Sequence, residues 1–211
     1  DQTYFLWMLT EENLRRTLFP LGGLTKPEVR QIAFEHGFEK LSKKTESQEI
    51  CFVPNNDYRQ FLSEQGVQVP SGKYVNAEGK VLGEHMGFCN YTIGQRKGLG
   101  IALGTPQFVT KIDAAHNEVT LGSHDDLYAT EVQADSARIR DLEWLQESPT
   151  VSALIRYKSP AVPAQIDLSD YTKEQPTLRL HFEQPVWGIT PGQSLVLYKD
   201  NLVVGGGLIE A

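Results

Sequence analysis

Cysteine, methionine and long apolar runs are all scarce in this chain of 211 residues. Its two cysteines, Cys51 and Cys89, are too few for a disulfide framework, and such sparse use is typical of a reducing compartment. No apolar run is long enough to cross a bilayer, and the chain begins with neither a Met nor a signal-peptide pattern. We therefore expect a cytoplasmic protein with no membrane partner, and a chain that is one part of a longer protein.

An overall excess of positive charge is also missing. The formal net charge is −7, which argues against a general nucleic-acid binder because neutralising phosphates requires clustered Lys and Arg. The charge is unevenly distributed, however. Residues 87–112 contain no Asp or Glu but include Arg96 and Lys97, and residues 150–166 include Arg156 without any acidic residue. These segments predict two locally cationic surfaces on an acidic protein.

Metal-binding patterns are absent as well. The five histidines are scattered along the chain, no Cys-x-x-Cys occurs, and neither cysteine has a histidine at ligand spacing. We therefore expect no metal site. Internal repeats, heptads and low-complexity tracts are absent too, so the chain should form ordinary globular domains.

Helix signals dominate the first 66 residues. Thr10 is a suitable N-cap for a short helix that would include Leu14, Leu18 and Phe19. Residues 25–28, Thr-Lys-Pro-Glu, form a capping box that predicts a second helix. Asp57 can cap a third helix that ends near Gly66. We expect residues 1–66 to be a helical segment.

Strand signals replace helix signals after this segment. Residues 72–75 and 80–83 flank a glycine-containing bend and predict one hairpin, and residues 108–113 with 118–122 predict a second. We expect residues 67–130 to form a small β-rich middle domain.

The last part of the chain, residues 131–211, alternates short apolar segments with Pro, Gly and Asp-Asn turns. The pattern predicts no helix here, and it predicts strands at 151–158, 164–168, 178–182, 194–198 and 202–205. Many short strands in so few residues favour a small antiparallel six-stranded β-barrel, in which closure removes exposed edges. The expected fold class is therefore mainly β, with a helical N-terminal segment, a β-rich middle domain and a C-terminal barrel.

The stretch of residues 43–53 is chemically the most informative. A polar run with two lysines and two glutamates leads into a short apolar segment that has Cys51 in its middle. A thiol acts as a nucleophile or sulfur carrier only as the thiolate, and nearby cations such as Lys43 and Lys44 would lower its pKa. Alternatively, Cys51 is a small hydrophobic residue in a β-core. The stretch alone leaves both interpretations open.

A second informative stretch is Gly94–Gly100. Its three glycines permit close approach of the backbone to a ligand, and Arg96 and Lys97 offer a planar fork and a point charge to phosphate oxygens. The spacing matches neither a P-loop nor a dinucleotide-binding fingerprint. A tight, solvated basic turn is the alternative interpretation.

Seven segments, taken in order, resemble the bacterial tRNA-specific 2-thiouridylase family. They are residues 1–6 (DQTYFL), 18–20 (LFP), 26–30 (KPEVR), 47–52 (SQEICF), 94–101 (GQRKGLGI), 190–193 (TPGQ) and 205–209 (GGGLI). The resemblance spans the whole chain, and several motifs in the right succession are more specific than any single one. The resemblance therefore favours a chemical role for Cys51.

Members of this family activate the C2 oxygen of the wobble uridine with ATP and replace it with sulfur. The resemblance implies that Cys51 carries a persulfide whose sulfur comes from a cysteine desulfurase or a relay protein, and that the substrates are the wobble-uridine tRNAs for Lys, Glu and Gln. It places ATP, its expected Mg²⁺ and a second, disulfide-forming cysteine in an upstream domain, whose Ser-Gly-Gly-x-Asp-Ser loop is absent from this sequence. Cys89 matches no motif position of the family. We expect this chain alone to bind no cofactor and to be inactive.

The resemblance also implies a set of tRNA contacts. The matching positions are Asp1, Gln2, Gln193 and a pair expected on a barrel strand, Arg156 and Tyr157. Arg96 and Lys97 join this set because of their charge. Glu46, where relatives more often have Asp, is a departure that affects only the geometry near Cys51. Two alternative functions remain: a barrel-based RNA-binding module with a structural cysteine, and a thiol-redox or cysteine-hydrolase domain.

Overall fold

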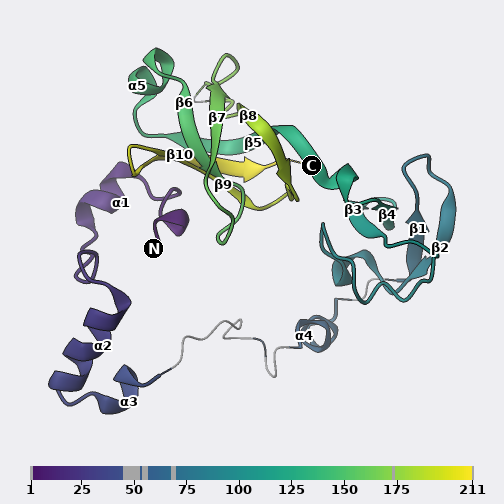
Figure 1. The fold of residues 1–211 in the computed structure, drawn as a ribbon, viewed down its shortest axis with the longest axis horizontal. Helices are drawn as coiled ribbons and strands as arrows, with labels where there is room; N and C mark the ends of the chain where they lie inside the picture. The colour runs from purple at the N-terminus through teal and green to yellow at the C-terminus, as the bar shows by residue number, and fades with distance from the viewer. Residues whose placement is uncertain (1, 45–52, 54–56, 68–69, 173, 211) are drawn as a thin grey trace. The chain divides into compact units, whose positions relative to one another are not determined.

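The computed structural model describes residues 2–44, 53, 57–67, 70–172 and 174–210. The chain divides into two compact units, one formed by residues 1–8 together with 69–211 and the other by residues 9–68 (Figure 1). In the described part, no helix combines the length and the apolar character that a membrane crossing requires.

Short helices are found in the described part of the unit of residues 9–68. Its α-helices are α1 (Glu11–Arg16), α2 (Lys26–Glu35), α3 (Glu39–Ser42) and α4 (Tyr58–Glu64). The expected caps are confirmed: the Thr10 hydroxyl accepts a hydrogen bond from the Asn13 amide at 3.1 Å, and Thr25 forms the capping box with Glu28. Asp57 caps α4 in the same way.

Helix α1 is shorter than the sequence pattern predicts. It ends at Arg16, so Leu18 and Phe19 lie beyond it. The backbone of Thr17 is extended, and its hydroxyl donates a hydrogen bond to the Asn13 carbonyl at 2.6 Å. This side chain satisfies a carbonyl that another helical turn would have used, and the helix stops there.

A four-stranded sheet forms the middle of the chain. Its strands are β1 (Gly72–Val75), β2 (Val81–His85), β3 (Phe108–Asp113) and β4 (Glu118–Gly122), in the order β2-β1-β4-β3. Both expected hairpins are confirmed, and a parallel pairing of β1 with β4 joins them. Tyr74, Val109 and Val119 are fully buried in the core beside this sheet.

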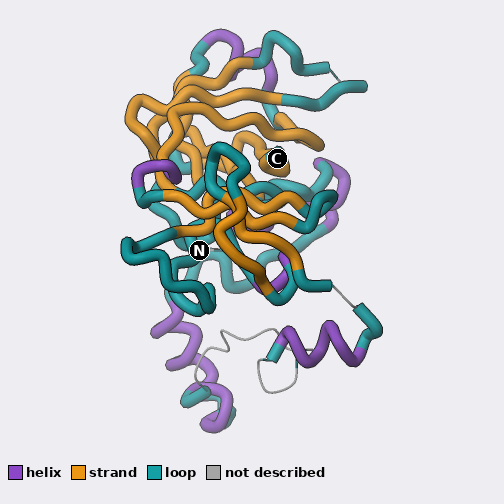
Figure 2. The backbone as a smooth tube through the Cα atoms, turned by 90° about the vertical axis from the view of Figure 1, so that its right-hand side faces the viewer, coloured by secondary structure: helices purple, strands orange, loops and turns teal. Residues whose placement is uncertain are grey.

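A closed barrel follows. Its strands are β5 (Tyr128–Ile139), β6 (Thr150–Leu154), β7 (Val162–Asp167), β8 (Leu178–Trp187), β9 (Ser194–Lys199) and β10 (Leu202–Ile209). They close in the order β10-β5-β8-β7-β6-β9, and every pairing is antiparallel. Figure 2 shows the strands of the chain in orange and its helices in purple. The predicted fold class, mainly β with a small sheet before a six-stranded antiparallel barrel, is confirmed.

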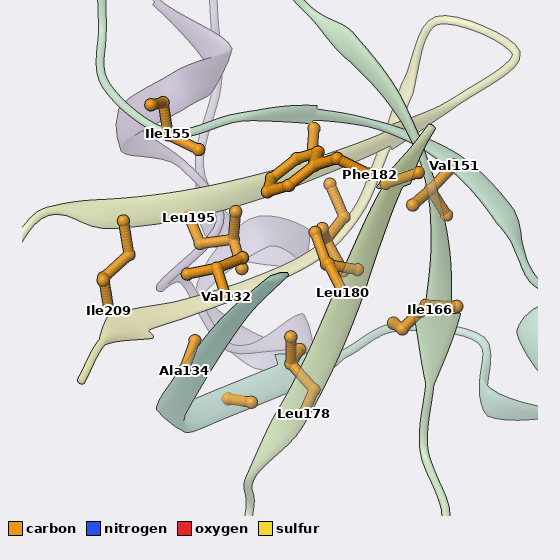
Figure 3. Close-up of a cluster of buried hydrophobic side chains, with 14 of the residues drawn as sticks. Val132, Ala134, Val151, Ile155, Ile166, Leu178, Leu180, Phe182, Leu195 and Ile209 are labelled. Atoms are coloured by element: carbon orange, nitrogen blue, oxygen red, sulfur yellow. The ribbon is translucent and has the colours of Figure 1, made fainter. Parts of the chain in front are cut away.

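The barrel core follows from strand periodicity. Along β8, Leu178, Leu180 and Phe182 are buried while the residues between them are exposed, as expected when successive side chains point to opposite faces. Figure 3 shows these three side chains in one cluster with Val132 and Leu195 from other strands. Burying each large apolar side chain stabilises the fold by about 1.5–3 kcal/mol.

Two expectations for the barrel region were wrong. A helix, α5 (Leu142–Glu147), separates β5 from β6: Asp141 caps it through the Trp144 amide at 2.9 Å, and Leu145 anchors it in the core. The strand expected at 151–158 ends at Leu154. The chain turns there, because the Ser159 amide and hydroxyl both donate to the Arg156 carbonyl.

Residues 3–8 pack with the barrel. Trp7 is 2% exposed and forms an apolar cluster with Tyr4 and Val196 of β9. A Cβ atom on Gly206 of β10 would lie 2.7 Å from the Trp7 ring, so this strand needs a glycine at the point of contact. The division of the chain into domains at residues 66 and 130 stays a prediction.

Candidate nucleic-acid interface

Two of the expected site residues, Cys51 and Asp1, lie outside the described residues. Lys43, expected to act on the Cys51 thiol, is exposed and lies 3.7 Å from Glu39 in a surface ion pair. Such a pair contributes at most about 1 kcal/mol, so it does not fix the lysine in place. The role of Cys51 stays a prediction.

Tyr4 brings three of the expected contact segments together. Its hydroxyl donates a hydrogen bond to the carbonyl of Ser194, the neighbour of Gln193, at 2.8 Å. Its ring centroid lies 5.7 Å from that of Tyr157, and it follows Gln2 by two positions. Burial raises the pKa of the Tyr4 phenol, so this donor stays protonated at neutral pH.

Tyr157 completes a small aromatic cluster with the N-terminal segment. Its ring lies 4.8 Å from that of Phe5, at an angle of 39°. Although the Tyr157 ring packs against Phe5, Tyr157 is still 42% exposed and can offer ring surface to a ligand. Arg156 and Tyr157 lie in the turn after β6 and not on a strand, which corrects the expected placement of this pair.

Gln193 occupies the last position of a β-turn. Its amide donates to the Thr190 carbonyl at 3.2 Å, and Pro191 and Gly192 fill the central positions, the glycine with φ of +80°. Pro followed by a positive-φ Gly is the signature of a type II turn. The turn presents the Gln193 side chain to solvent, next to the Ser194 carbonyl that Tyr4 binds.

Arg156 lies over the indole of Trp187 at the end of β8. The distance from Cζ to the ring centroid is 5.4 Å, within the range of a cation–π contact. Since Arg156 is exposed, its guanidinium N–H groups remain available to an anionic ligand.

The same indole touches the glycine-rich stretch. A Cβ atom on Gly94 would lie 2.6 Å from Cη2 of Trp187, and Gly94 has φ of +83°. Backbone hydrogen bonds of Gly94 and Gln95 with Val109 attach this stretch to β3, and the Gln95 side chain bonds to the Thr92 amide and the Lys97 carbonyl. The stretch is therefore a turn held in place by hydrogen bonds, and Arg96 and Lys97 are exposed on it.

The structure thus links the two cationic segments of the sequence through one side chain. Trp187 contacts Arg156 on one side and the turn of Arg96 and Lys97 on another, and it stacks on His124 at 5.8 Å. Neither Trp187 nor Tyr4 was a candidate from the sequence. No local spacing signals them, because the fold alone brings their partners together.

The assembled groups have the chemistry of a nucleic-acid-binding surface. Guanidinium, ammonium, carboxamide and phenol groups bind phosphates, ribose hydroxyls and base edges. Within the described residues, no group of three or more potential ligands is placed to hold a metal ion, and Cys89 is half-buried without a disulfide partner.

Three family models match successive parts of the chain. They are the tRNA methyl transferase HUP domain over residues 1–55, the tRNA methyl transferase PRC-barrel domain over residues 59–123, and the Aminomethyltransferase beta-barrel domain over residues 134–209.

Curated relatives match over nearly the full length of the chain. Proteins named tRNA-specific 2-thiouridylase MnmA are 43% identical in Desulfitobacterium hafniense (99% of this chain, 58% of the relative), 43% in Acetivibrio thermocellus (100% and 57%) and 45% in Herpetosiphon aurantiacus (100% and 57%). The chain therefore spans less than two thirds of the length of these relatives. Matches of this kind along the entire chain show that it belongs to the tRNA-specific 2-thiouridylase family.

Proposed function

We propose that this chain supplies the sulfur-carrying cysteine and the tRNA-binding surface of a tRNA-uridine 2-sulfurtransferase, which makes 2-thiouridine at the wobble position. The observation that carries the proposal is the arrangement around Tyr4 and Trp187 in a member of this family. Tyr4 contacts Tyr157 and binds the carbonyl next to Gln193, and Trp187 contacts Arg156 and the turn of Arg96 and Lys97.

Each group on this surface has a binding task that suits its chemistry. Arg156, Arg96 and Lys97 contact tRNA phosphates, which contribute affinity without reading the sequence. Tyr157 stacks on a base or bonds a ribose hydroxyl, and Gln193 bonds a base edge or sugar. Gln2, and Asp1 outside the described residues, are further tRNA contacts in this proposal.

Cys51 acts as the sulfur carrier in this proposal. A cysteine desulfurase or relay protein transfers a sulfur atom to the Cys51 thiolate and forms a persulfide. The terminal sulfur then bonds to C2 of the activated uridine as the C2 oxygen leaves. A second cysteine thiolate breaks the S–S bond, which leaves the sulfur on the base and a disulfide between the two cysteines.

ATP would supply the activation that makes the C2 oxygen a leaving group. The Ser-Gly-Gly-x-Asp-Ser loop that binds ATP in this family does not occur in these 211 residues, and the Gly94–Gly100 turn lacks phosphate-loop spacing. We therefore assign no residue of this chain to ATP or Mg²⁺. The complete reaction belongs to a protein that includes such a domain, while the transfer of sulfur to Cys51 and the binding of tRNA are testable on this chain.

Sulfur loading tests the role of Cys51. With a cysteine desulfurase and cysteine that carries radioactive sulfur, the chain should acquire a label that a reductant removes. Cys51→Ser should abolish the label and Cys89→Ser should retain it, because Cys89 is outside the proposed route. An unlabelled chain that still binds tRNA would instead identify a non-catalytic RNA-binding module with a structural cysteine.

Arg156→Ala tests the tRNA surface. Loss of a charged hydrogen-bonding contact should weaken tRNA binding by about 1–3 kcal/mol, measured as the dissociation constant at low salt. Arg138→Ala is the matched control, because Arg138 is an exposed arginine on β5 of the same barrel. Equal dissociation constants for Arg156→Ala and the unmodified chain would refute the proposed contact.

A further inference from the structure

A pocket of about 400 Å³ opens beside Tyr157. Its volume is within the range of small-molecule sites. Apart from two aliphatic side chains, it is lined by Tyr4, Tyr157, Tyr198, Ser152, Asp200 and Asn201. Ser152, Tyr198, Asp200 and Asn201 are not among the tRNA contacts that we expected from the sequence.

Three tyrosine rings form the aromatic part of the pocket. The hydroxyl groups of Tyr4 and Tyr198 are already bonded, to the Ser194 carbonyl at 2.8 Å and to the Thr3 hydroxyl at 3.0 Å. These bonds fix the two rings, and Tyr157 adds a ring that is 42% exposed. Fixed aromatic rings favour a flat aromatic ligand, since every nucleobase has a face that stacks on them.

The polar part of the pocket has unused hydrogen-bonding capacity. Within the described residues, the side chains of Ser152, Asp200 and Asn201 make no hydrogen bond or ion pair. Asp200 and Asn201 are the two loop residues of the hairpin between β9 and β10, with φ of 49° and 65°. This is the geometry of a type I′ turn, which holds both side chains on a rigid connection.

The charges around the pocket select which part of an RNA enters it. An ionised carboxylate accepts hydrogen bonds and repels phosphate, so Asp200 favours an uncharged group with N–H donors. Arg156 precedes Tyr157 and attracts phosphate. A nucleotide would therefore place its base in the pocket and its phosphate outside, toward Arg156.

We propose that this pocket binds one unstacked guanine base of the bound RNA. Guanine has two adjacent donors, N1–H and the 2-amino group, that match the two oxygens of the Asp200 carboxylate. Uracil has a single N–H between two carbonyl oxygens, and a carboxylate repels those oxygens. This inference rests on the proposed function, because it adds a base-specific subsite to the same tRNA surface.

Short single-stranded RNAs test the subsite directly. The probes are UUGU, UUUU and UUIU, in which inosine lacks the 2-amino group, and the measurement is the dissociation constant for the 211-residue chain. We expect UUGU to bind about tenfold more tightly than UUUU, as one matched base contact allows, and UUIU to lie between them. Equal binding of UUGU and UUUU would overturn the proposal.

Asp200→Asn distinguishes base recognition from a general charge effect. Asn is tolerated at a positive φ, so the turn should be retained. The variant should lose most of the guanine preference without weakening UUUU, whereas removal of a repulsive charge would strengthen all probes equally and contradict the proposal. Glu183→Gln is the matched control, since it removes one exposed negative charge from β8 outside the pocket and should leave the preference unchanged.

Binding of tRNA, measured in parallel, separates the two hypotheses. One outcome is that tRNA binds, that Arg156→Ala weakens tRNA binding, and that the short RNAs show no guanine preference. This result would refute the guanine subsite and support the tRNA-binding surface. If neither tRNA nor any short RNA binds, both are wrong.

Discussion

At the scale of single residues, Trp187 and Gly94 explain how distant cationic segments meet. The indole lies close to the Gly94 backbone, where any side chain would overlap it. The positive φ of Gly94 adds a second reason for glycine, because left-handed backbone is strained for other residues. The contact with Trp187 thus excludes a side chain at position 94, and the turn that carries Arg96 and Lys97 requires the positive φ there.

Gly94→Ala should therefore destabilise the unit that contains the barrel. We expect a loss of about 1–2 kcal/mol from backbone strain and a further 1–3 kcal/mol from overlap with Trp187. Gly104→Ala is the control: its φ of +77° is similar, but nothing lies within 4 Å of its added Cβ, so only the strain applies. The measurement is the free energy of unfolding in denaturant, and equal losses in the two variants would contradict the proposed contact.

The candidate site was only partly predictable at this scale. Residue type and a family resemblance made Arg156, Tyr157 and Gln193 candidates, because both are read from the local sequence. Tyr4 and Trp187, which bring the segments together, carry no local signal. Tyr4 binds a carbonyl 190 positions away in the sequence, a pairing that only the folded barrel creates.

At the scale of elements, what the sequence predicts depends on how local the determining interactions are. The helix starts at Thr10, Thr25 and Asp57 were predictable, because each cap bonds within three residues of itself. The six-residue helix α5 was missed, since its start at Asp141 looks like a turn and its stability depends on Leu145 in the barrel core. Strand β6 ends early for a similar reason: the alternation continues through Ile155, which is buried although it lies in the following turn.

The β3–β4 hairpin contains a pH-sensitive pair. His116 Nδ1 lies 2.9 Å from Asp113 Oδ2, and the His116 amide also donates to Asp113. The hydrogen bond to Asp113 is the main reason that the pKa of His116 is raised above its ordinary value of 6.5. The folded state therefore binds this proton more tightly than the unfolded chain does.

The stabilisation from this pair should be complete below pH 6.5 and disappear as the pH rises through the raised pKa of His116. We expect the free energy of unfolding to fall more between about pH 5.5 and about pH 8 in the unmodified chain than in His116→Gln, which cannot titrate. The lowered pKa of Asp113 acts only in more acidic solution and does not affect this window. Identical pH profiles for the two proteins would show that the pair contributes nothing.

At the scale of the whole chain, the N-terminal segment and the barrel form one unit although they are far apart in sequence. The Arg140 guanidinium donates a hydrogen bond to the Leu6 carbonyl at 3.0 Å, and Thr3 bonds to Tyr198. Trp7 contributes the largest buried side chain of the segment. Because residues 3–8 carry Tyr4 and follow Gln2, the position of this segment also shapes the proposed tRNA surface.

Trp7→Ala should therefore cost both stability and tRNA affinity. Removing a fully buried indole destabilises a core by about 3–5 kcal/mol, and release of the segment would withdraw Tyr4 from Tyr157 and Ser194. Met8→Ala is the matched control, because Met8 is 53% exposed and its loss should change stability by less than about 0.5 kcal/mol. The loss of stability is measured by denaturant unfolding followed by near-ultraviolet circular dichroism. The loss of tRNA affinity is measured as the dissociation constant under conditions where the barrel remains folded. A variant that loses stability but binds tRNA normally would show that the segment supports the barrel without contributing to the surface, since the two effects have separate physical causes.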